Sequence, residues 1–299
     1  MSWRGLMLGV VNLDKPVGPT SHDMVGLMRR LTGIRRIGHA GTLDPLASGV
    51  LPILVGAATR FSEELSGGGK RYTATIRLGE RSATDDGEGP IEPGSAPPDA
   101  AAIRAALGTF VGTIEQTPPA FSARKQAGRR AHRAARAGEP LTLAPRSVRI
   151  DSIEVLGIEA QGTTTDVVID LRCGAGTYVR SLARDLGEQL GCGGHLAGLR
   201  RTEAAGLHAA DGHDPETLRA LAAEGRFGAA LLPVGPLLGL PPLVLEPPAA
   251  ARFMNGGAPH VDDPGAGRRA VYEADRLIGT GRLEDGILRP DKVLPGADR

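Results

Sequence analysis

The sequence is poor in cysteine, in aromatic residues and in long hydrophobic runs. Its two cysteines, Cys173 and Cys192, are too few for a disulfide framework in a chain of 299 residues. The opening segment MSWRGLMLGV is too short and too interrupted for a signal peptide, and no run reaches the length that spans a membrane. We therefore expect a cytoplasmic protein that does not contact the membrane.

Common metal and nucleotide motifs are also missing. Cys192 and His195 form a Cys-x-x-His pair, but no second pair completes a zinc site. The chain contains no G-x-S-x-G, no H-E-x-x-H, no P-loop and no dinucleotide-binding fingerprint. We therefore expect neither a bound metal nor an organic cofactor.

Basic residues are concentrated in one segment, although the net charge is only +1. Between positions 124 and 149 the sole acid is Glu139. The basic residues there are Arg124, Lys125, Arg129, Arg130, Arg133, Arg136, Arg146 and Arg149. Such density suits a phosphate backbone, and a solvated helix face is the alternative.

Hydrophobic periodicity predicts an α+β fold that mixes antiparallel strands with helices. Helices are expected at 21–33, which Ser21 would cap and Gly33 would end, within 94–112, and at 177–191. Strands are expected at 50–56, 70–79, 146–160 and 163–176, the last two as an antiparallel pair. A Pro- and Leu-rich linker near 233 leads to a β-rich module, so we predict domains at 1–235 and 236–299.

The segment GHAGTLDPLASG, residues 38–49, places one carboxylate among small residues. Asp44 followed by Pro45 is a common helix start, with the aspartate as the N-cap. Small neighbours such as Gly41 would also let a flat ligand approach the carboxylate. A lone carboxylate can act as a nucleophile or base if a cation from elsewhere in the chain keeps it ionised.

This segment resembles the catalytic motif of the bacterial tRNA pseudouridine-55 synthases, the TruB family. Further segments resemble the family's other motifs in the same order: NLDKPVGPTS, KRYTATIRLGERSATDDGEG, QTPPAFSARKQAGRRAHRAARAGE, CGAGTYVRSLARDLG and GCGGHLAGLRRTEAAG. The resemblance implies a mixed, largely antiparallel sheet flanked by helices, and a small β-rich, PUA-like C-terminal domain. It also implies isomerisation of one uridine in the T loop of tRNA, by flipping of the base.

The resemblance assigns the chemistry to three residues. Asp44 matches the essential aspartate, which attacks either C1′ of the ribose or C6 of the base. Tyr72 matches the tyrosine that stacks on the flipped base and assists removal of the C5 proton, although its strand pattern alone favours a core residue. Arg180 matches the arginine that pairs with the aspartate, and we expect the two side chains within ion-pair distance.

Other residues acquire supporting roles from the same resemblance. His39 matches a histidine that helps to open the T loop, and Lys15 matches a lysine that supports the active-site loop. Leu182 and Leu199 match apolar residues of the base pocket, although helix packing explains Leu182 equally well. Asp86 could contact RNA or cap a turn, and we favour the turn.

Two residues in and just before the basic segment depart from the family pattern. Phe121 stands where the family usually has Tyr, and His132 stands where Tyr or a similar residue is common. Two other functions are alternatives: an RNA chaperone that binds tRNA without chemistry, and a guide-RNA-dependent synthase that works with protein partners. The combination of Asp44, Tyr72 and Arg180 favours an enzyme over the chaperone. The basic segment at 124–149 would let one chain bind tRNA by itself. It therefore favours a monomer without an obligatory protein partner.

Replacing Arg129, Arg130 and Arg133 together by alanine should weaken tRNA binding. Each phosphate contact that is lost reduces the number of counterions released on binding. The slope of log affinity against log salt concentration should therefore flatten by up to about three units. Titrations of tRNA at several salt concentrations measure this slope. A variant that kept its affinity and slope but lost its rate at saturating tRNA would assign the segment to the chemistry instead.

Overall fold

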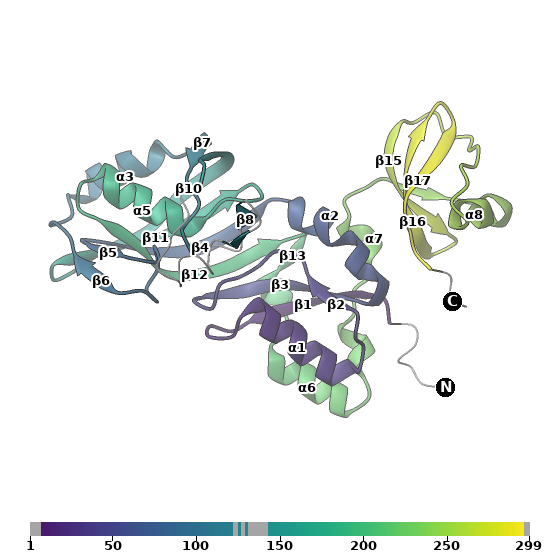
Figure 1. The fold of residues 1–299 in the computed structure, drawn as a ribbon, viewed down its shortest axis with the longest axis horizontal. Helices are drawn as coiled ribbons and strands as arrows, with labels where there is room; N and C mark the ends of the chain where they lie inside the picture. Colours follow the sequence, from purple (N-terminus) through teal and green to yellow (C-terminus); the bar gives the residue numbers. More distant parts are fainter. Residues whose placement is uncertain (1–6, 122–124, 127–128, 131–142, 296–299) are drawn as a thin grey trace.

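The computed structural model describes residues 7–121, 125–126, 129–130 and 143–295. Figure 1 shows a large sheet with helices against it and a smaller β-rich part that holds the C-terminal strands. Both parts match the α+β architecture expected from the sequence. The boundary between 235 and 236 stays a prediction.

The large sheet has nine strands, ordered β1-β3-β12-β4-β11-β10-β7, with β2 paired to β3 and β13 to β12. All its pairs are antiparallel except β3 with β12, so the sheet is mixed, as predicted. The strands are β1 (Gly9–Lys15), β2 (Ile37–His39), β3 (Ala47–Val55), β4 (Lys70–Leu78), β7 (Gly112–Gln116), β10 (Arg146–Gln161), β11 (Thr164–Cys173), β12 (Gly194–Ala204) and β13 (Leu207–His208).

Helices lie against two ends of this sheet (Figure 1). Near β1 and β3 are α1 (Ser21–Thr32) and α6 (Pro215–Ala223), and near β10 and β11 are α3 (Ala100–Gly108) and α5 (Val179–Gln189). Shorter elements join them: 3-10 helices at Gly56–Phe61, Ala209–Asp211 and Phe227–Ala230, helices α2 (Ser62–Gly67) and α7 (Val234–Leu237), and the paired strands β5 (Glu80–Ser82) and β6 (Ile91–Pro93).

Local sequence explains both ends of α1, with one correction to the expected cap. Helix α1 is capped by Thr20 and not by Ser21: the Thr20 hydroxyl accepts from the amide of Asp23, whose carboxylate binds the Thr20 amide in return. Gly33 ends this helix in the left-handed conformation, as expected.

The expected helix start at Asp44-Pro45 is wrong. A single turn follows Pro45, and β3 begins at Ala47. The segment pairs with β1, β2 and β12, so its amides and carbonyls are satisfied by neighbouring strands. Pairing with distant parts of the chain therefore overrides the local helix signal.

The C-terminal part is a four-stranded sheet in the order β14-β15-β16-β17, with one helix against it. Its elements are β14 (Pro242–Val244), α8 (Pro247–Met254), β15 (Gly267–Glu273), β16 (Arg276–Glu284) and β17 (Ile287–Val293). It has a hydrophobic core of its own, in which Phe253, Val271, Ile278 and Leu288 are fully or almost fully buried.

One carboxylate on α2 joins the two parts. Glu64 accepts hydrogen bonds from Arg268 at 3.0 Å and from Lys292 at 2.7 Å. Beside this contact, Leu294 packs into the same hydrophobic cluster as Phe61 and Leu65. The C-terminal part therefore docks directly on α2.

Glu64→Gln should weaken this docking by about 1–2 kcal/mol, because two cations lose their common carboxylate. Hydrogen exchange of β17 and thermal unfolding would detect the loss. Although burial opposes ionisation, the hydrogen bonds from Lys292 and Arg268 hold the pKa of Glu64 below its usual value. Its contribution is therefore present above the pKa of the unfolded chain and is lost as the pH falls.

The exposed neighbour Glu63 provides the matched control. Glu63→Gln should leave stability within about 0.5 kcal/mol of the wild type. Equal effects of the two substitutions would contradict a specific role for Glu64.

Candidate active site

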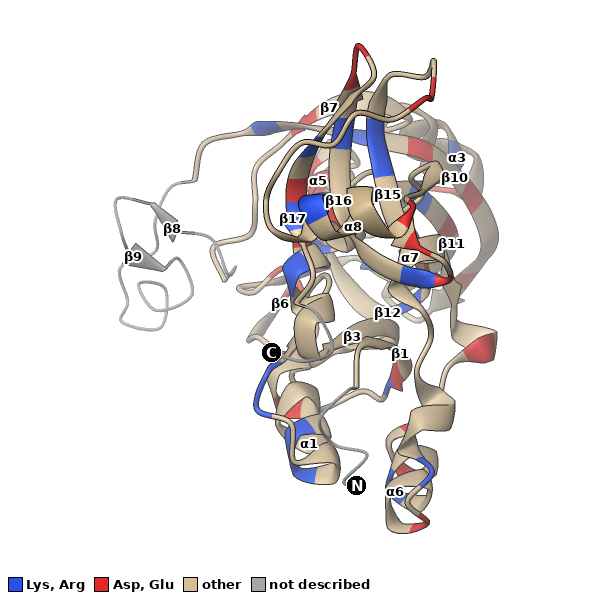
Figure 2. Ribbon diagram, turned by 90° about the vertical axis from the view of Figure 1, so that its right-hand side faces the viewer, with Lys and Arg blue, Asp and Glu red and all other residues tan. Residues whose placement is uncertain are grey.

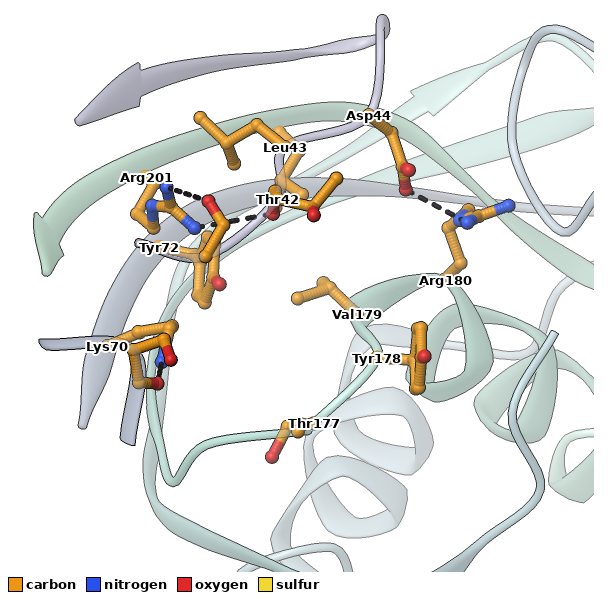
Figure 3. A pocket seen from close by; sticks show the side chains of 14 residues that line it. Thr42, Leu43, Asp44, Lys70, Tyr72, Thr177, Tyr178, Val179, Arg180 and Arg201 are labelled. Carbon is orange, nitrogen blue, oxygen red and sulfur yellow. Dashed lines mark hydrogen bonds and ion pairs between the residues drawn. The ribbon is translucent and has the colours of Figure 1, made fainter. Parts of the chain in front are cut away.

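A pocket of about 250 Å³ opens between the large sheet and the start of α5 (Figure 3). The loop before β3 contributes Asp44, β4 contributes Tyr72, α5 contributes Arg180, and β12 contributes Leu199 and Arg201. Elements that are far apart in the sequence thus place a carboxylate, a phenol and two guanidinium groups around one small space.

Arg180 links the rest of the pocket to residues 41–46, the loop before β3 that carries Asp44 and is called the catalytic loop after its proposed role. Its Nη2 lies 2.9 Å from the Asp44 carboxylate, which confirms the predicted ion pair. The same nitrogen donates to the carbonyl of Phe121 at 2.9 Å, while Nη1 donates to the carbonyl of Thr84 at 3.2 Å and lies 3.4 Å from the carboxylate of Asp86.

The two carboxylates beside Arg180 have opposite exposures. The Asp44 side chain is 42% exposed, whereas Asp86 is 4% exposed. Asp86 does cap the turn, because it accepts from the Thr84 hydroxyl and from the amide of Glu88. It is also the buried counter-ion of Arg180, a role that the sequence analysis missed.

The position of Arg180 is fixed from the backbone upward. Helix α5 begins at Val179, and the Gln116 side chain forms two hydrogen bonds with the backbone of the preceding residue, Tyr178. Gln116 accepts from the Tyr178 amide at 2.8 Å and donates to its carbonyl at 3.1 Å. Because a side chain at the end of β7 replaces missing helical hydrogen bonds, the first turn of α5 is anchored to the sheet.

Lys15 supports the catalytic loop from below. Its ammonium is buried and donates to the carbonyls of Pro16 and Pro19, both at 2.8 Å. The turn that it closes donates from the Gly18 amide to the carbonyl of Pro45 at 2.9 Å. Lys15 is not among the residues that line the pocket, and its supporting role stays a prediction that these contacts favour.

Arg201 holds the same loop from the opposite side, and the sequence analysis missed it. Its side chain is 1% exposed and donates to the carbonyls of Val50 at 2.7 Å, Gly41 at 3.1 Å and Thr42 at 3.5 Å. Gly41 has a φ of +92°, and a Cβ there would lie 3.4 Å from Arg201. A side chain at position 41 would therefore strain both the turn and this contact.

Tyr72 lies directly across from Arg201, because β4 and β12 pair these residues in register. The tyrosine is 7% exposed and lines the pocket. Burial raises the pKa of its hydroxyl, and the charge of Arg201 acts in the opposite direction. Tyr72 therefore meets its ligand as a neutral phenol near neutral pH.

The two leucines assigned to the base pocket have different environments. Leu199 lines the pocket, as expected. Leu182 is fully buried in the hydrophobic core and is not among the residues that line this pocket, so its assignment to the base pocket stays a prediction. Val179 and Arg180, at the start of α5, line the pocket (Figure 3). Leu182 belongs to the hydrophobic core.

His39 ends β2 opposite Ile53 and lies outside the pocket lining. Burial lowers the pKa of its imidazole, and Arg201 lowers it further. Its Nδ1 is buried and finds no partner among the described residues. Its role in opening the T loop stays a prediction.

The basic segment falls largely outside the described residues. Arg124 and Arg133 lie there, and of Lys125, Arg129 and Arg130 only the backbone is described, in the two-residue strands β8 (Lys125–Gln126) and β9 (Arg129–Arg130). On the described surface, Figure 2 shows acidic and basic residues interspersed.

The described part of the chain has neither a metal-binding cluster nor a membrane-spanning helix. No group of three or more His, Cys, Asp or Glu residues in it could hold a metal ion. None of its helices combines the length and the apolar character that crossing a bilayer requires.

Comparisons with known proteins identify the family of this chain. Residues 29–179 match the N-terminal domain of the TruB family pseudouridylate synthases, and residues 180–238 match the C-terminal domain of tRNA pseudouridylate synthase B. The fold is that of a pseudouridine synthase. The chain belongs to the TruB family.

Relatives and solved structures cover nearly the whole chain. The tRNA pseudouridine synthase B of Acaryochloris marina is 42% identical to it, over 97% of this chain and 99% of that protein. The tRNA pseudouridine synthase B of Burkholderia pseudomallei is also 42% identical, over 96% of each chain. A structure of an H/ACA RNP bound to a substrate RNA is 26% identical with a TM-score of 0.73, over 97% of this chain and 86% of that one. An archaeal Nop10–Cbf5 complex is similar, with a TM-score of 0.72, 26% identity and coverage of 97% and 87%.

Arg180→Met should remove activity and destabilise the fold by about 3 kcal/mol, because it leaves the buried carboxylate of Asp86 without its counter-ion. Denaturant unfolding measures the loss. Adding Asp86→Asn should restore at least about 1 kcal/mol, since the orphaned charge is then gone.

The matched control adds Asp44→Asn to Arg180→Met. Because Asp44 is exposed, its neutralisation should restore almost no stability. Equal recovery from the two second substitutions would contradict the assignment of Asp86 as the buried partner.

Proposed function

We propose that this protein isomerises uridine 55 in the T loop of tRNA to pseudouridine, with Asp44 as the attacking carboxylate. The observation that carries the proposal is the Asp44–Arg180 pair at the pocket that Tyr72 lines. The curated relatives that share 42% of its residues are named tRNA pseudouridine synthases B, which supports tRNA as the substrate over a guide-RNA-dependent reaction.

The geometry suits a nucleotide that has left its stack. A base inside a folded T loop cannot reach a carboxylate in a pocket, so the nucleotide must be flipped out. The small residues around Asp44 leave space for it, Tyr72 offers an aromatic face, and Leu199 offers an apolar wall. Basic residues at 124–133 would hold the phosphate backbone outside the pocket.

The reaction needs an ionised carboxylate close to the sugar and the base. Arg180 lies 2.9 Å from the Asp44 carboxylate and fixes one of its oxygens. The other oxygen is free to attack C1′ of the ribose or C6 of the uracil. As a neutral phenol, Tyr72 stacks on the base and takes part in proton transfer from C5 through its hydroxyl.

The proposal extends to the state of the protein in the cell. We expect a monomer that acts on tRNA in the cytoplasm without an obligatory protein partner. The charge of the segment 124–149 is the reason, because it lets one chain bind tRNA by itself.

Asp44→Asn should abolish pseudouridine formation while tRNA still binds. Amide and carboxylate have nearly the same shape, but the amide is neither a nucleophile nor a base. Mass spectrometry of nuclease-digested tRNA, together with a binding titration, measures both properties.

Asp275→Asn, in an exposed turn of the C-terminal part, is the control and should retain wild-type turnover. Wild-type turnover in Asp44→Asn would refute the role of this carboxylate. An inactive wild-type protein on correctly folded tRNA would refute the proposed function itself.

A further inference from the structure

Four cations lie on the two central strands that form the floor of the pocket. Lys70 and Arg71 begin β4, and Arg200 and Arg201 are neighbours on β12. Successive side chains of a strand point to opposite faces, so each pair sends one cation to the pocket and one to the other face.

The cations on the outer face are paired with carboxylates. Arg71 lies 2.8 Å from Asp170 and 3.0 Å from Glu203, and Arg200 lies 2.8 Å from Asp14. These are ordinary ion pairs at a partly exposed surface.

The cations on the pocket face are held by carbonyl oxygens instead. Lys70 donates to the carbonyls of Ser66 at 2.8 Å and Gly68 at 2.9 Å, at the end of α2. Arg201 donates to the three carbonyls of β3 and the catalytic loop described above. Among the described residues, neither cation forms an ion pair with a carboxylate.

The two unpaired cations converge on the same region. A Cβ built on Gly41 would lie 3.4 Å from Nη1 of Arg201 and 3.6 Å from Cε of Lys70. Tyr72 lies between them in Figure 3, across the pocket from the Asp44–Arg180 pair. The pocket therefore has a positive side that faces its carboxylate.

This arrangement is unfavourable while the pocket is empty. Burial lowers the pKa of the Lys70 ammonium, and Arg201 lowers it further, so both desolvation and mutual repulsion oppose the charge. Lys70 has three N–H donors, of which the two carbonyls use two. A negatively charged group placed between Lys70 and Arg201 would relieve their repulsion. It would also accept a hydrogen bond from the third N–H of Lys70.

We propose that Lys70 and Arg201 form a cationic wall that stabilises the negative charge developing on the uracil ring during isomerisation. This inference rests on the proposed function, since it assigns the pocket to a flipped uridine. It gives the two residues an electrostatic task that no carboxylate-paired cation on the outer face can perform.

The charge arises in either course of the reaction. If a carboxylate oxygen of Asp44 bonds to C1′, the N1–C1′ bond breaks and its electron pair stays on the uracil, which becomes an anion shared among N1, O2 and O4. The ring then turns, C5 bonds to C1′, the carboxylate leaves, and the C5 proton goes to a base while N1 gains a proton.

If the carboxylate adds to C6 instead, the electron pair of the C5–C6 double bond moves toward C4 and its oxygen, giving an enolate. The ring again carries one negative charge before the glycosidic bond breaks. Because the charge is absent from the bound uridine, stabilising it raises the rate rather than the affinity.

The test compares Lys70→Met with wild type in single turnovers at saturating tRNA. We expect a rate about 100-fold lower, the size found when one preorganised donor to a developing charge is removed, and a Kd changed by less than about threefold. Lys70→Gln can still donate to the carbonyls of Ser66 and Gly68, so it separates lost charge from lost packing. It should be slowed almost as much.

The second arm uses tRNA that carries 5-fluorouridine at the target position and follows the disappearance of this nucleoside by mass spectrometry. Fluorine withdraws electrons and stabilises the ring anion by itself. The loss caused by Lys70→Met should therefore shrink to about tenfold on this substrate.

Arg71→Met is the matched control, because it removes a cation from the next position of the same strand but from the outer face. It should retain the wild-type rate. Equal losses for Lys70→Met on uridine and 5-fluorouridine, a loss in affinity in place of rate, or an active Lys70→Gln would each overturn the proposal. A wild-type protein that forms no pseudouridine would instead refute the proposed function.

Discussion

The active site depends on one guanidinium group placed between two carboxylates of different exposure. Arg180 is buried, and its charge must be balanced inside the protein, which Asp86 does from a buried turn. That balance leaves Arg180 free to hold the exposed Asp44 at 2.9 Å without losing its own position. The Asp44 carboxylate, which we propose as the nucleophile, can thus face solvent while one of its oxygens stays fixed.

The sheet converts this local arrangement into a pocket. Strands β4 and β12 carry Tyr72 and Arg201 opposite each other, and β3 runs parallel beside β12, so Arg201 reaches the carbonyls of the catalytic loop. The same strands separate two charge environments, with ion pairs outside and uncompensated cations inside. Helix α2 connects the pocket to the C-terminal part. Its Ser66 carbonyl accepts a hydrogen bond from Lys70, and its Glu64 carboxylate accepts one from Lys292.

Several features were predictable because their signals are local. The alternation of residues 70–79 gave β4, and the Gly33 stop gave the end of α1. The pairing of Asp44 with Arg180 followed from a resemblance, since nothing in the spacing of the two residues indicates contact. The place of Leu182 could not be read from the sequence, because an amphipathic helix buries several leucines, and only the packing of α5 puts Leu182 in the hydrophobic core.

By itself, the sequence determined the α+β class and most strand and helix positions, because periodicity is written in neighbouring residues. Its motifs also singled out Asp44 as the candidate nucleophile. Only the tertiary structure decided that Asp44-Pro45 starts no helix, that Asp86 is a buried counter-ion, and that Arg201 points inward while Arg200 does not. These outcomes depend on which distant strand supplies a carbonyl or a carboxylate. Hydrogen bonding and charge compensation are satisfied in space, and the order of residues along the chain does not specify them.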